Sequence, residues 1–256
     1  ATIQSLHAQT RALADILVID DGSTDGTGTV AAAAGATVVR LAHNRGKAAA
    51  HNTGLALVTT PYVLTVDADT CLAPNALAWL LPPMADPTVG AVCAAVLPST
   101  LTTLWERGRF LEYILGQTIY KQGQHRLRSV LVAAGCCTLY RTNVLGAMGG
   151  FRSLTFTEDM DMAWLLCAQG YRTAFAPRAH CAALEPTTLR MYLRQLDRWY
   201  RGMLQCLTVN RFRTVWRLKL LAYWYATDAV TTPLWLFGGF LGGTGSVLHS
   251  MAGALL

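Results

Sequence analysis

The sequence predicts an α/β protein built on a mostly parallel sheet with flanking helices, and two observations support this fold class. Short apolar runs alternate along the chain with helical patterns, an order typical of doubly wound sheets. Two of these runs end in acids, Asp20-Asp21 and Asp67-Ala-Asp69. Because ligands of such sheets bind outside the carboxyl ends of the strands, these acids predict a binding site at that edge.

The expected strands are short apolar segments bounded by turn residues. They cover residues 16–19, 36–41, 62–66, 89–97, 129–141 and 171–177. The expected helices cover residues 48–58, 103–128, an acidic segment beginning near 158, and 186–207. The second helix carries its apolar residues on one side, the third has Thr155 and Glu158 spaced as a capping box, and the fourth has Pro186 near its start.

The composition is apolar for a soluble protein. Of the 256 residues, 52% are hydrophobic and 14% charged, with a mean hydropathy of +0.31. The net charge is +6, and eight basic residues but one acid lie between residues 187 and 219. This basic, Trp- and Tyr-containing stretch predicts contact with membrane lipid on the cytoplasmic side. A nucleic-acid interface is disfavoured because the aromatic residues follow a helical apolar pattern, so we expect no nucleic-acid partner.

The end of the sequence has the composition of a membrane segment. Residues 229–256 carry no formal charge and are long enough to cross a bilayer. Pro233 and five glycines between residues 238 and 245 interrupt them, so a re-entrant segment or a buried hairpin are alternatives. We therefore expect a catalytic domain at residues 1–207 and a membrane-associated part at 208–256, with the protein in the plasma or inner membrane and the catalytic domain in the cytoplasm.

Two further expectations concern the start of the chain and the cysteines. The sequence begins at Ala1 with what reads as the middle of a helix, which suggests a trimmed N-terminus. The seven cysteines show no CxxC or metal-ligand spacing, which predicts reduced, buried thiols in a cytosolic compartment.

The acids at the strand ends have a chemical use and a structural alternative. Asp67 and Asp69 offer the carboxylates that Mg²⁺ or Mn²⁺ prefers when it shares its shell with a diphosphate; a solvated turn is the alternative. Asp20 and Asp21 would accept hydrogen bonds from a base or ribose, or cap the next helix as an Asx-turn. Lys47 begins a helix where a phosphate would bind, or lies in a solvated first turn.

Two helices carry further candidates. Glu158, Asp159 and Asp161 are favoured at a helix N-terminus by the macrodipole alone, so this stretch by itself is most simply a helix start. Gln195, Arg198 and Trp199 share one helical face. Arginine can bind a diphosphate bidentately and tryptophan can support a sugar ring, although a helix lying on a membrane surface explains the pattern equally well.

Taken in order, DDGSTD (20–25), NRGKA (44–48), DADT (67–70), TED (157–159) and QLDRW (195–199) resemble the motifs of family 2 inverting glycosyltransferases. The TED and QxxRW pair narrows the resemblance to the membrane-bound processive group, which includes cellulose, chitin, hyaluronan and poly-N-acetylglucosamine synthases. The resemblance covers residues 3–207 and implies a GT-A fold.

The resemblance also implies a role for each motif. The uridine of a UDP-sugar would bind Asp20 and Asp21, and Lys47 would help to hold the nucleotide. Asp67 would lie beside the ribose and diphosphate, and Asp69 would ligate Mg²⁺ or Mn²⁺. Asp159 would be the general base, with Glu158 beside it. The diphosphate and acceptor would contact Gln195, Arg198, Trp199, Gly135 and Cys136.

Three departures from the pattern stand out. Leu196 follows Gln195 where relatives commonly carry Arg or Gln, and His51 replaces an aliphatic residue. The strand that usually opens the fold and helps to hold uracil is missing from the sequence. His180 is a conceivable metal ligand, but a strand-end histidine explains it more simply.

The predicted function is therefore transfer of a sugar, N-acetylglucosamine by resemblance, from a UDP-sugar to the end of a growing polysaccharide. A single displacement with Asp159 as base would give a β-glycosidic bond. The alternatives are a non-processive membrane-attached glycosyltransferase acting on a lipid or glycan, and a non-catalytic nucleotide-sugar-binding subunit. A dinucleotide-dependent oxidoreductase is disfavoured because no GxGxxG follows the first strand.

Overall fold

The computed structural model describes residues 1–210, 220 and 223. The chain divides into two units, Ala1–Val215 and Trp216–Leu256, and every element below belongs to the first. Most of the predicted membrane-associated part, including residues 229–256, lies outside the described residues. Among the residues that are described, no helix is both long and apolar enough to cross a membrane.

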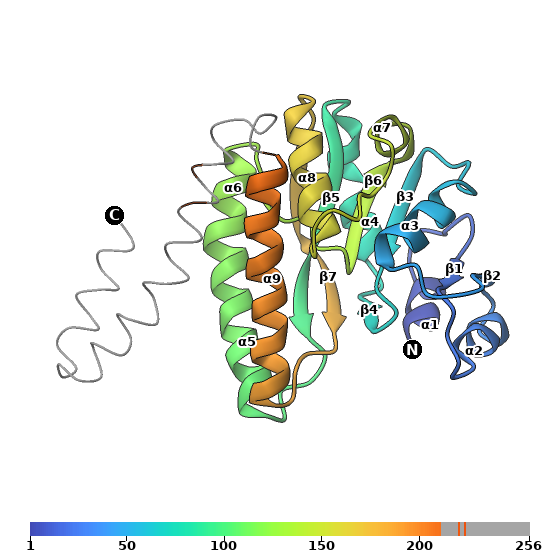
Figure 1. Cartoon of the computed structure of the whole chain (residues 1–256). Coiled ribbons are helices and arrows are strands. Elements are labelled where there is room, and N and C mark those ends of the chain that lie inside the picture. The colour runs from blue at the N-terminus through green and yellow to red at the C-terminus, as the bar shows by residue number, and fades with distance from the viewer. Residues whose placement is uncertain (211–219, 221–222, 224–256) are drawn as a thin grey trace. The chain divides into compact units, whose positions relative to one another are not determined.

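The strands form two sheets (Figure 1). A small parallel sheet pairs β1 (Leu17–Asp20) with β2 (Thr37–Arg40). A larger sheet has the order β3-β6-β5-β7-β4. Its strands are β3 (Tyr62–Val66), β4 (Thr70–Leu72), β5 (Val89–Pro98), β6 (Cys137–Arg141) and β7 (Arg172–Ala183).

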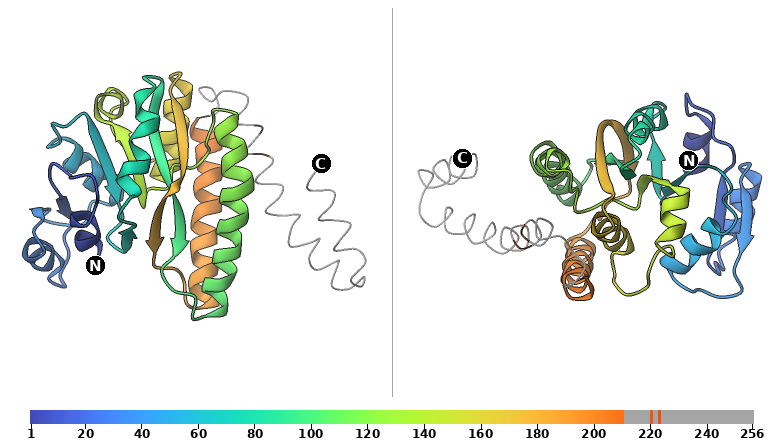
Figure 2. Two further views of the ribbon diagram at one scale, coloured as in Figure 1. Left: turned by 180° about the vertical axis from the view of Figure 1, so that it is seen from behind. Right: turned by 90° about the horizontal axis from the view of Figure 1, so that it is seen from above.

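The helices surround the larger sheet and flank the smaller one (Figures 1 and 2). The first four are α1 (Thr2–His7), α2 (Thr27–Ala33), α3 (Lys47–Leu55) and α4 (Ala76–Leu80), followed by a 3₁₀ turn, η1 (Pro82–Ala85). The remainder are α5 (Leu104–Leu115), η2 (Gly116–Lys121), α6 (Gln122–Arg126), α7 (Thr142–Ala147), α8 (Glu158–Ala168) and α9 (Leu189–Val209).

The expectation of a mostly parallel sheet is wrong for the described strands. Only β1–β2 and β5–β7 pair parallel, whereas β3–β6, β5–β6 and β4–β7 are antiparallel. The reason is that β6 inserts between β3 and β5 in the opposite direction. Alternation of strand and helix patterns indicates an α/β protein, but it does not fix the direction of a strand that returns from a distant part of the chain.

One strand is longer than its sequence predicts. The apolar run at 171–177 continues through Pro177 to Ala183, because β7 resumes its pairing with β5 after a register shift between Ala94 and Ala95. Proline lacks a ladder donor and is tolerated at such a bulge. This extension of β7 also provides the pairing edge for the short strand β4.

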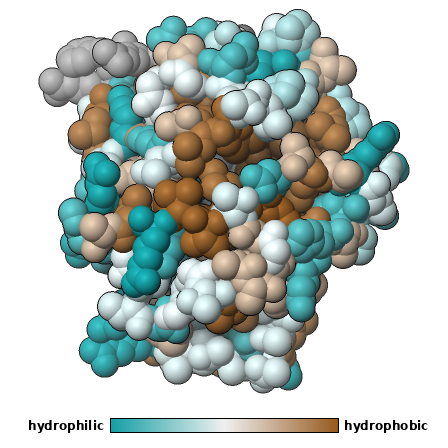
Figure 3. Space-filling model, turned by 90° about the vertical axis from the view of Figure 1, so that its right-hand side faces the viewer, coloured by the Kyte–Doolittle hydropathy of each residue, from teal (hydrophilic) through white to brown (hydrophobic). Residues whose placement is uncertain are grey.

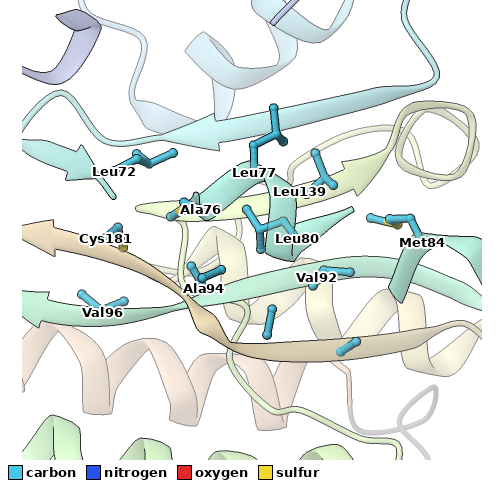
Figure 4. Close-up of a cluster of buried hydrophobic side chains, with 14 of the residues drawn as sticks. Leu72, Ala76, Leu77, Leu80, Met84, Val92, Ala94, Val96, Leu139 and Cys181 are labelled. Atoms are coloured by element: carbon cyan, nitrogen blue, oxygen red, sulfur yellow. The ribbon is translucent and has the colours of Figure 1, made fainter. Parts of the chain in front are cut away.

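The main core lies against the larger sheet. Small and apolar side chains of β5, β6 and β7 pack against α4, which contributes the fully buried Ala76 and Leu80 (Figure 4). A second cluster of buried side chains packs α7 and α8 against the sheet. Tyr140, Met162 and Leu166 are buried in this cluster. These two clusters fix the positions of the strands whose ends bear the candidate site residues.

The long helix expected at 103–128 is present with an interruption. Thr103 and Glu106 form a reciprocal capping box at the start of α5, and the π-helical turn η2 separates α5 from α6. In that turn Gln117 bonds both the backbone nitrogen and oxygen of Val96, at 2.7 and 2.6 Å. The helix is therefore tied to β5 where the strand changes register.

The capping box predicted for the acidic helix is wrong. Thr157, not Thr155, is the N-cap of α8, and its side chain makes no capping hydrogen bond. The Thr157 hydroxyl instead lies 3.7 Å from the Cys206 thiol of α9. Tertiary packing against α9 has taken the place of local capping.

Candidate active site

The N-terminus of α8 brings its acids to the loop before β6. The backbone N–H of Gly135 donates a hydrogen bond to Asp159 Oδ2 at 2.8 Å, and the N–H of Met160 donates to Asp159 Oδ1 at 2.8 Å. A side chain at Gly135 would be crowded, since its Cβ would lie 3.2 Å from Lys47 Nζ and in contact with Asp159 Oδ2 at 3.4 Å. The glycine therefore allows the catalytic candidate and the loop to approach closely.

Lys47 joins this acidic helix to the end of β3. Its ammonium lies 2.6 Å from Asp67 Oδ1 and 3.3 Å from Glu158 Oε1. Lys47 is the first residue of α3, Asp67 follows β3, and Glu158 begins α8. We call Lys47, Asp67, Gly135, Glu158 and Asp159 the catalytic cluster. The sequence-based prediction that acids far apart in the chain converge is confirmed for these residues.

The charges of the catalytic cluster change each other's protonation. Burial raises the pKa of Asp159, as does the neighbouring Glu158 carboxylate, while Lys47 and the two backbone donors oppose the rise. Burial disfavours the charged form of Lys47, but Asp67 and Glu158 outweigh it and raise the pKa of Lys47. A carboxylate with a raised pKa is a better general base than an ordinary aspartate, because its pKa lies nearer the pH at which the enzyme works.

Asp161 is held in the interior by an ion pair. Its fully buried carboxylate accepts bidentate hydrogen bonds from Arg152, at 2.5 and 2.7 Å, and a third from Asn210 at 2.8 Å. The carboxylate is therefore paired within the fold. Arg152 neutralises it, and the pair ties α8 to the residue that ends α9.

The two acids proposed to bind a cation, Asp67 and Asp69, have different surroundings. Asp67 points to Lys47, whereas Asp69 is exposed and accepts only a long hydrogen bond of 3.4 Å from Thr70. Within the described part of the chain, no group of three His, Cys, Asp or Glu side chains could hold a metal ion by itself. Two carboxylates still fit Mg²⁺ or Mn²⁺, because these ions take one or two protein ligands and complete their shell with substrate phosphates and water.

The candidates for nucleotide binding lie at the ends of the small sheet. Asp21 accepts two backbone hydrogen bonds, from Arg45 and Gly46, each at 2.8 Å. Asp20 is buried and accepts from the Ser23 N–H at 2.8 Å. Hydrogen bonding from the Ser23 side chain, and then from its backbone, lowers the pKa of the Asp20 carboxyl. Figure 3 shows the face that lies on the right of Figure 1, where polar side chains surround a hollowed apolar centre.

The QxxRW residues of α9 divide into two kinds. Arg198 is exposed, whereas Gln195 and Trp199 are half-buried. The Gln195 carbonyl accepts a 2.6 Å hydrogen bond from Arg109 of α5, and the Arg109 guanidinium carbon lies 4.7 Å from the centre of the Trp199 ring. The structure therefore directs Gln195 toward α5.

Arg109, Arg152 and Asn210 are parts of the site that sequence reasoning missed. Arg109 pairs with Glu112 one turn along α5, with Glu185, and with Gln195, which lies 86 positions away. It lies on the side of the helix opposite most of the apolar residues of the 103–128 pattern, and those residues are exposed, so the pattern gave no signal that Arg109 is buried.

Gly202 is another missed position. A Cβ on Gly202 would lie 2.5 Å from the Thr157 side chain, so α9 rests directly on the residue that caps α8. Gln205 of α9 also accepts the Phe156 N–H at 2.9 Å. The TED segment therefore takes its position partly from α9.

Two remaining candidates have defined surroundings. The His51 ring packs edge-on against Phe151, with centroids 4.8 Å apart, and burial together with Lys47 lowers the pKa of His51 to about 4. Cys136 is half-buried and hydrogen-bonded to Cys181, which together with burial raises the pKa of the Cys136 thiol. All seven cysteines are free thiols, as expected, and Cys136 has the character of an unreactive one.

Residues 1–149 match the family model described as glycosyl transferase family 2. The chain belongs to that family. This membership confirms the predicted sugar-transferring enzyme, and a member of glycosyl transferase family 2 is expected to bind a nucleotide sugar at the strand ends described above.

Curated relatives extend the similarity beyond the matched residues. The chain is 28% identical over 228 residues to "Poly-beta-1,6-N-acetyl-D-glucosamine synthase" of Staphylococcus aureus (strain COL), and 26% identical over 228 residues to the protein of that name from Staphylococcus epidermidis. Each alignment covers 87% of this family 2 chain and 55% of the relative. The chain thus spans about half the length of the curated relatives it matches, and the predicted resemblance to polysaccharide synthases is confirmed.

Solved structures support the GT-A-like α/β fold. A mannosyltransferase from Pyrobaculum calidifontis in complex with GDP-Man and Mn²⁺ superposes with a TM-score of 0.68 at 21% identity, covering 99% of this chain and 75% of that one. S. aureus TarS 1-349 in complex with UDP-GlcNAc gives a TM-score of 0.55 at 17% identity, covering 74% and 55%. The prediction of a GT-A-like α/β fold is therefore confirmed.

Proposed function

We propose that this chain is the catalytic part of an inverting hexosyltransferase that moves N-acetylglucosamine from UDP-N-acetylglucosamine to the end of a growing polysaccharide. The observation that carries the proposal is the catalytic cluster, in which Asp159, held by Gly135, lies beside the Lys47–Asp67 pair. The names of the curated relatives support the donor and the polymeric product.

The proposed reaction is one in-line displacement. The acceptor hydroxyl gives its proton to Asp159 as its oxygen attacks the anomeric carbon. The bond between that carbon and the diphosphate oxygen breaks on the opposite face, and UDP departs with the bonding electrons. The configuration inverts, so an α-linked donor yields a β-glycosidic bond. Burial suits Asp159 to this role because it raises the affinity of the carboxylate for the proton.

Other residues bind and orient the substrates. Asp20 and Asp21 would bind the uridine, and Lys47 would exchange its contact with Asp67 for a diphosphate oxygen. Mg²⁺ or Mn²⁺ held by Asp69 and Asp67 would neutralise charge on the leaving diphosphate. Arg198 would add a second positive charge there, while Trp199 and the Gly135–Cys136 loop would support the acceptor sugar.

We also propose that the protein works at the cytoplasmic face of a plasma or inner membrane. The supporting observation is that α9 exposes Leu189, Leu193 and Leu204 beside a row of arginines. Amphipathic helices of this composition favour an anionic lipid surface. Sedimentation with anionic and with neutral vesicles tests this proposal, and equal absence from both pellets would contradict it.

Product length distinguishes the processive reaction from single addition. Membranes holding the full-length protein are incubated with each UDP-sugar, with and without Mn²⁺, and both released UDP and product size are measured. We expect cation-dependent UDP release with UDP-N-acetylglucosamine and a ladder of oligomers. One new species in place of a ladder would indicate a non-processive glycosyltransferase, and binding without UDP release would indicate a non-catalytic subunit.

A further inference from the structure

Arg109 of α5 is a buried cation outside the catalytic cluster. Its side chain has no exposed surface. The guanidinium Nη1 donates to Glu112 Oε2 at 2.6 Å, and Nε lies 3.5 Å from Glu185 Oε2. Burying an arginine costs several kcal/mol unless its partners are well placed, so an apolar residue would pack this helix at lower cost. The position therefore calls for an explanation beyond packing.

The guanidinium plane is covered by aromatic rings of α9. Its central carbon lies 4.4 Å from the centre of the Tyr192 ring and 4.7 Å from that of Trp199. Tyr192 and Trp199 are seven positions apart, two turns along one face of α9. Cations attract ring faces, most strongly when both are shielded from water. Arg109 therefore restrains the indole of Trp199 and the helix face that carries it.

The same side chain also fixes Gln195. Arg109 Nη2 donates to Gln195 Oε1 at 2.6 Å, and the Gln195 side chain lies beside the Glu185 carboxylate. The oxygen of the Gln195 amide is thus held by Arg109. Glu185 is anchored in turn by the Tyr113 hydroxyl at 2.7 Å. We call Arg109, Tyr113, Glu185, Tyr192, Gln195 and Trp199 the α5–α9 cluster.

We propose that Arg109 is a positioning residue for the acceptor end of the site, which sets the orientation of Trp199 and Gln195 without touching the reacting atoms. The proposal rests on the function proposed above, in which these two residues support the acceptor sugar. Trp199 is only half-buried, so part of its indole remains available to a sugar ring. Displacement of such a platform by about 1 Å costs up to about a hundredfold in rate.

Arginine is required here for its shape as well as its charge. A planar guanidinium can bond two carboxylates and an amide while two rings lie over its faces, whereas a lysine ammonium cannot do so. The variant Arg109→Lys keeps the positive charge beside Glu185 and removes this geometry. Arg107→Lys is the matched control, because Arg107 lies on the same helix, is exposed, and donates only to the Leu101 carbonyl at 3.0 Å.

The experiment measures donor and acceptor separately in the full chain. UDP release is followed with UDP-N-acetylglucosamine alone and with increasing concentrations of a defined oligosaccharide. We expect Arg109→Lys to lower kcat/KM for the acceptor by about tenfold to a hundredfold, with the donor KM and acceptor-independent UDP release within about twofold of wild type. Arg107→Lys should match wild type in every measurement.

A coupling test separates positioning from general damage. Trp199→Phe alone is expected to weaken acceptor use, and adding Arg109→Lys should cost much less than it does in the wild-type background, because both changes disrupt one arrangement. If Arg109→Lys does not fold, Tyr192→Leu replaces it, since it removes a ring from the guanidinium face, with Tyr192→Phe as its control.

The outcomes are distinguishable. An active wild type whose Arg109→Lys form keeps its acceptor kcat/KM, or loses donor and acceptor use equally, overturns the positioning role alone. Additive effects of the two substitutions also overturn it. A wild-type protein that transfers no sugar overturns the proposed function and the positioning role with it.

Discussion

The two halves of the site are built differently. At the nucleotide end, Asp20 and Asp21 accept hydrogen bonds from backbone amides of neighbouring turns. At the acceptor end Arg109 is a fully buried charge, and Asp161 of α8 is another; each has a partner distant in the chain, Gln195 for Arg109 and Asn210 for Asp161. The first arrangement can adjust to a ligand at lower cost at Asp21, because that residue is half-buried, whereas Asp20 is buried. The second is rigid, because breaking any contact leaves a charge buried without a partner.

This difference predicts that substitutions at the acceptor end cost more than those at the nucleotide end. Substitution of Asp159, the proposed base, is expected to change the chemistry rather than the folding. The following substitutions test the comparison in order of decreasing effect.

Replacing Asp159 with Asn should have the largest effect on turnover. The proposed base is lost while the side chain keeps its shape, so we expect kcat to fall by about 10²- to 10⁴-fold. UDP release is the measurement, and UDP affinity should remain close to wild type. Asp197→Asn is the control, because Asp197 is exposed and pairs only with Arg201 on the same helix. Full turnover by Asp159→Asn would show that another group acts as the base.

Replacing Arg152 with Met should have the largest effect on stability. Asp161 would be left buried and charged, which costs about 3–5 kcal/mol of unfolding free energy. Chemical denaturation monitored by circular dichroism measures the loss. Arg201→Met breaks an exposed pair and should cost less than about 1 kcal/mol. Equal losses in the two variants would remove the distinction between buried and exposed ion pairs here.

Replacing Gly202 with Ala should destabilise the contact between α9 and α8. The new methyl would meet Thr157 at 2.5 Å, and such overpacking costs about 1–3 kcal/mol. Thermal unfolding provides the measurement, and turnover should fall because Thr157 precedes the acidic pair. Gly108→Ala in α5 is the control, since open space surrounds it; it should be neutral or stabilising. A stable, fully active Gly202→Ala protein would show that α8 is positioned without α9.

Replacing Asp21 with Asn should have a smaller effect. One of two backbone hydrogen bonds within the protein would be lost at a half-exposed position, which costs about 1 kcal/mol of unfolding free energy. Chemical denaturation measures this loss, and calorimetric titration with UDP shows whether the substitution also weakens nucleotide binding. A destabilisation as large as that of Arg152→Met would show that the nucleotide end is as rigid as the acceptor end.

The pH dependence provides the finest test. The pKa of Asp159 is raised above its usual 3.8 by burial and by Glu158, so the acidic limb of kcat/KM should lie above that pH. Glu158→Gln removes a negative charge and should move the limb to lower pH. Stability depends on pH in the opposite direction. The folded state holds the Asp159 proton more tightly than the unfolded chain does. The unfolding free energy therefore decreases as the pH rises from 3.8 through the raised pKa. A limb that Glu158→Gln leaves in place would assign it to another group.

Much of the catalytic cluster could be predicted from the sequence because its motifs are local. Lys47 begins a helix, Asp67 follows a strand and Asp159 lies in a helix's first turn, and each placement follows from apolar periodicity and turn residues. The strand at Tyr62–Val66 has the predicted bounds. The capping of α8 was predicted wrongly, because a local rule was applied where the contact with α9 decides the outcome.

By itself, the sequence determined where the main strands and helices lie, and which carboxylates stand at their ends, because these depend on side-chain pattern over a few turns. The strand expected at 129–141 is nevertheless limited to Cys137–Arg141, and the short strand β4 was not predicted. Only the tertiary structure decided the antiparallel insertion of β6, the approach of Gly135 to Asp159, and the burial of Arg109 against α9. The physical reason is that strand direction and the partner of a buried charge depend on which distant segments share the interior, and no local pattern encodes that.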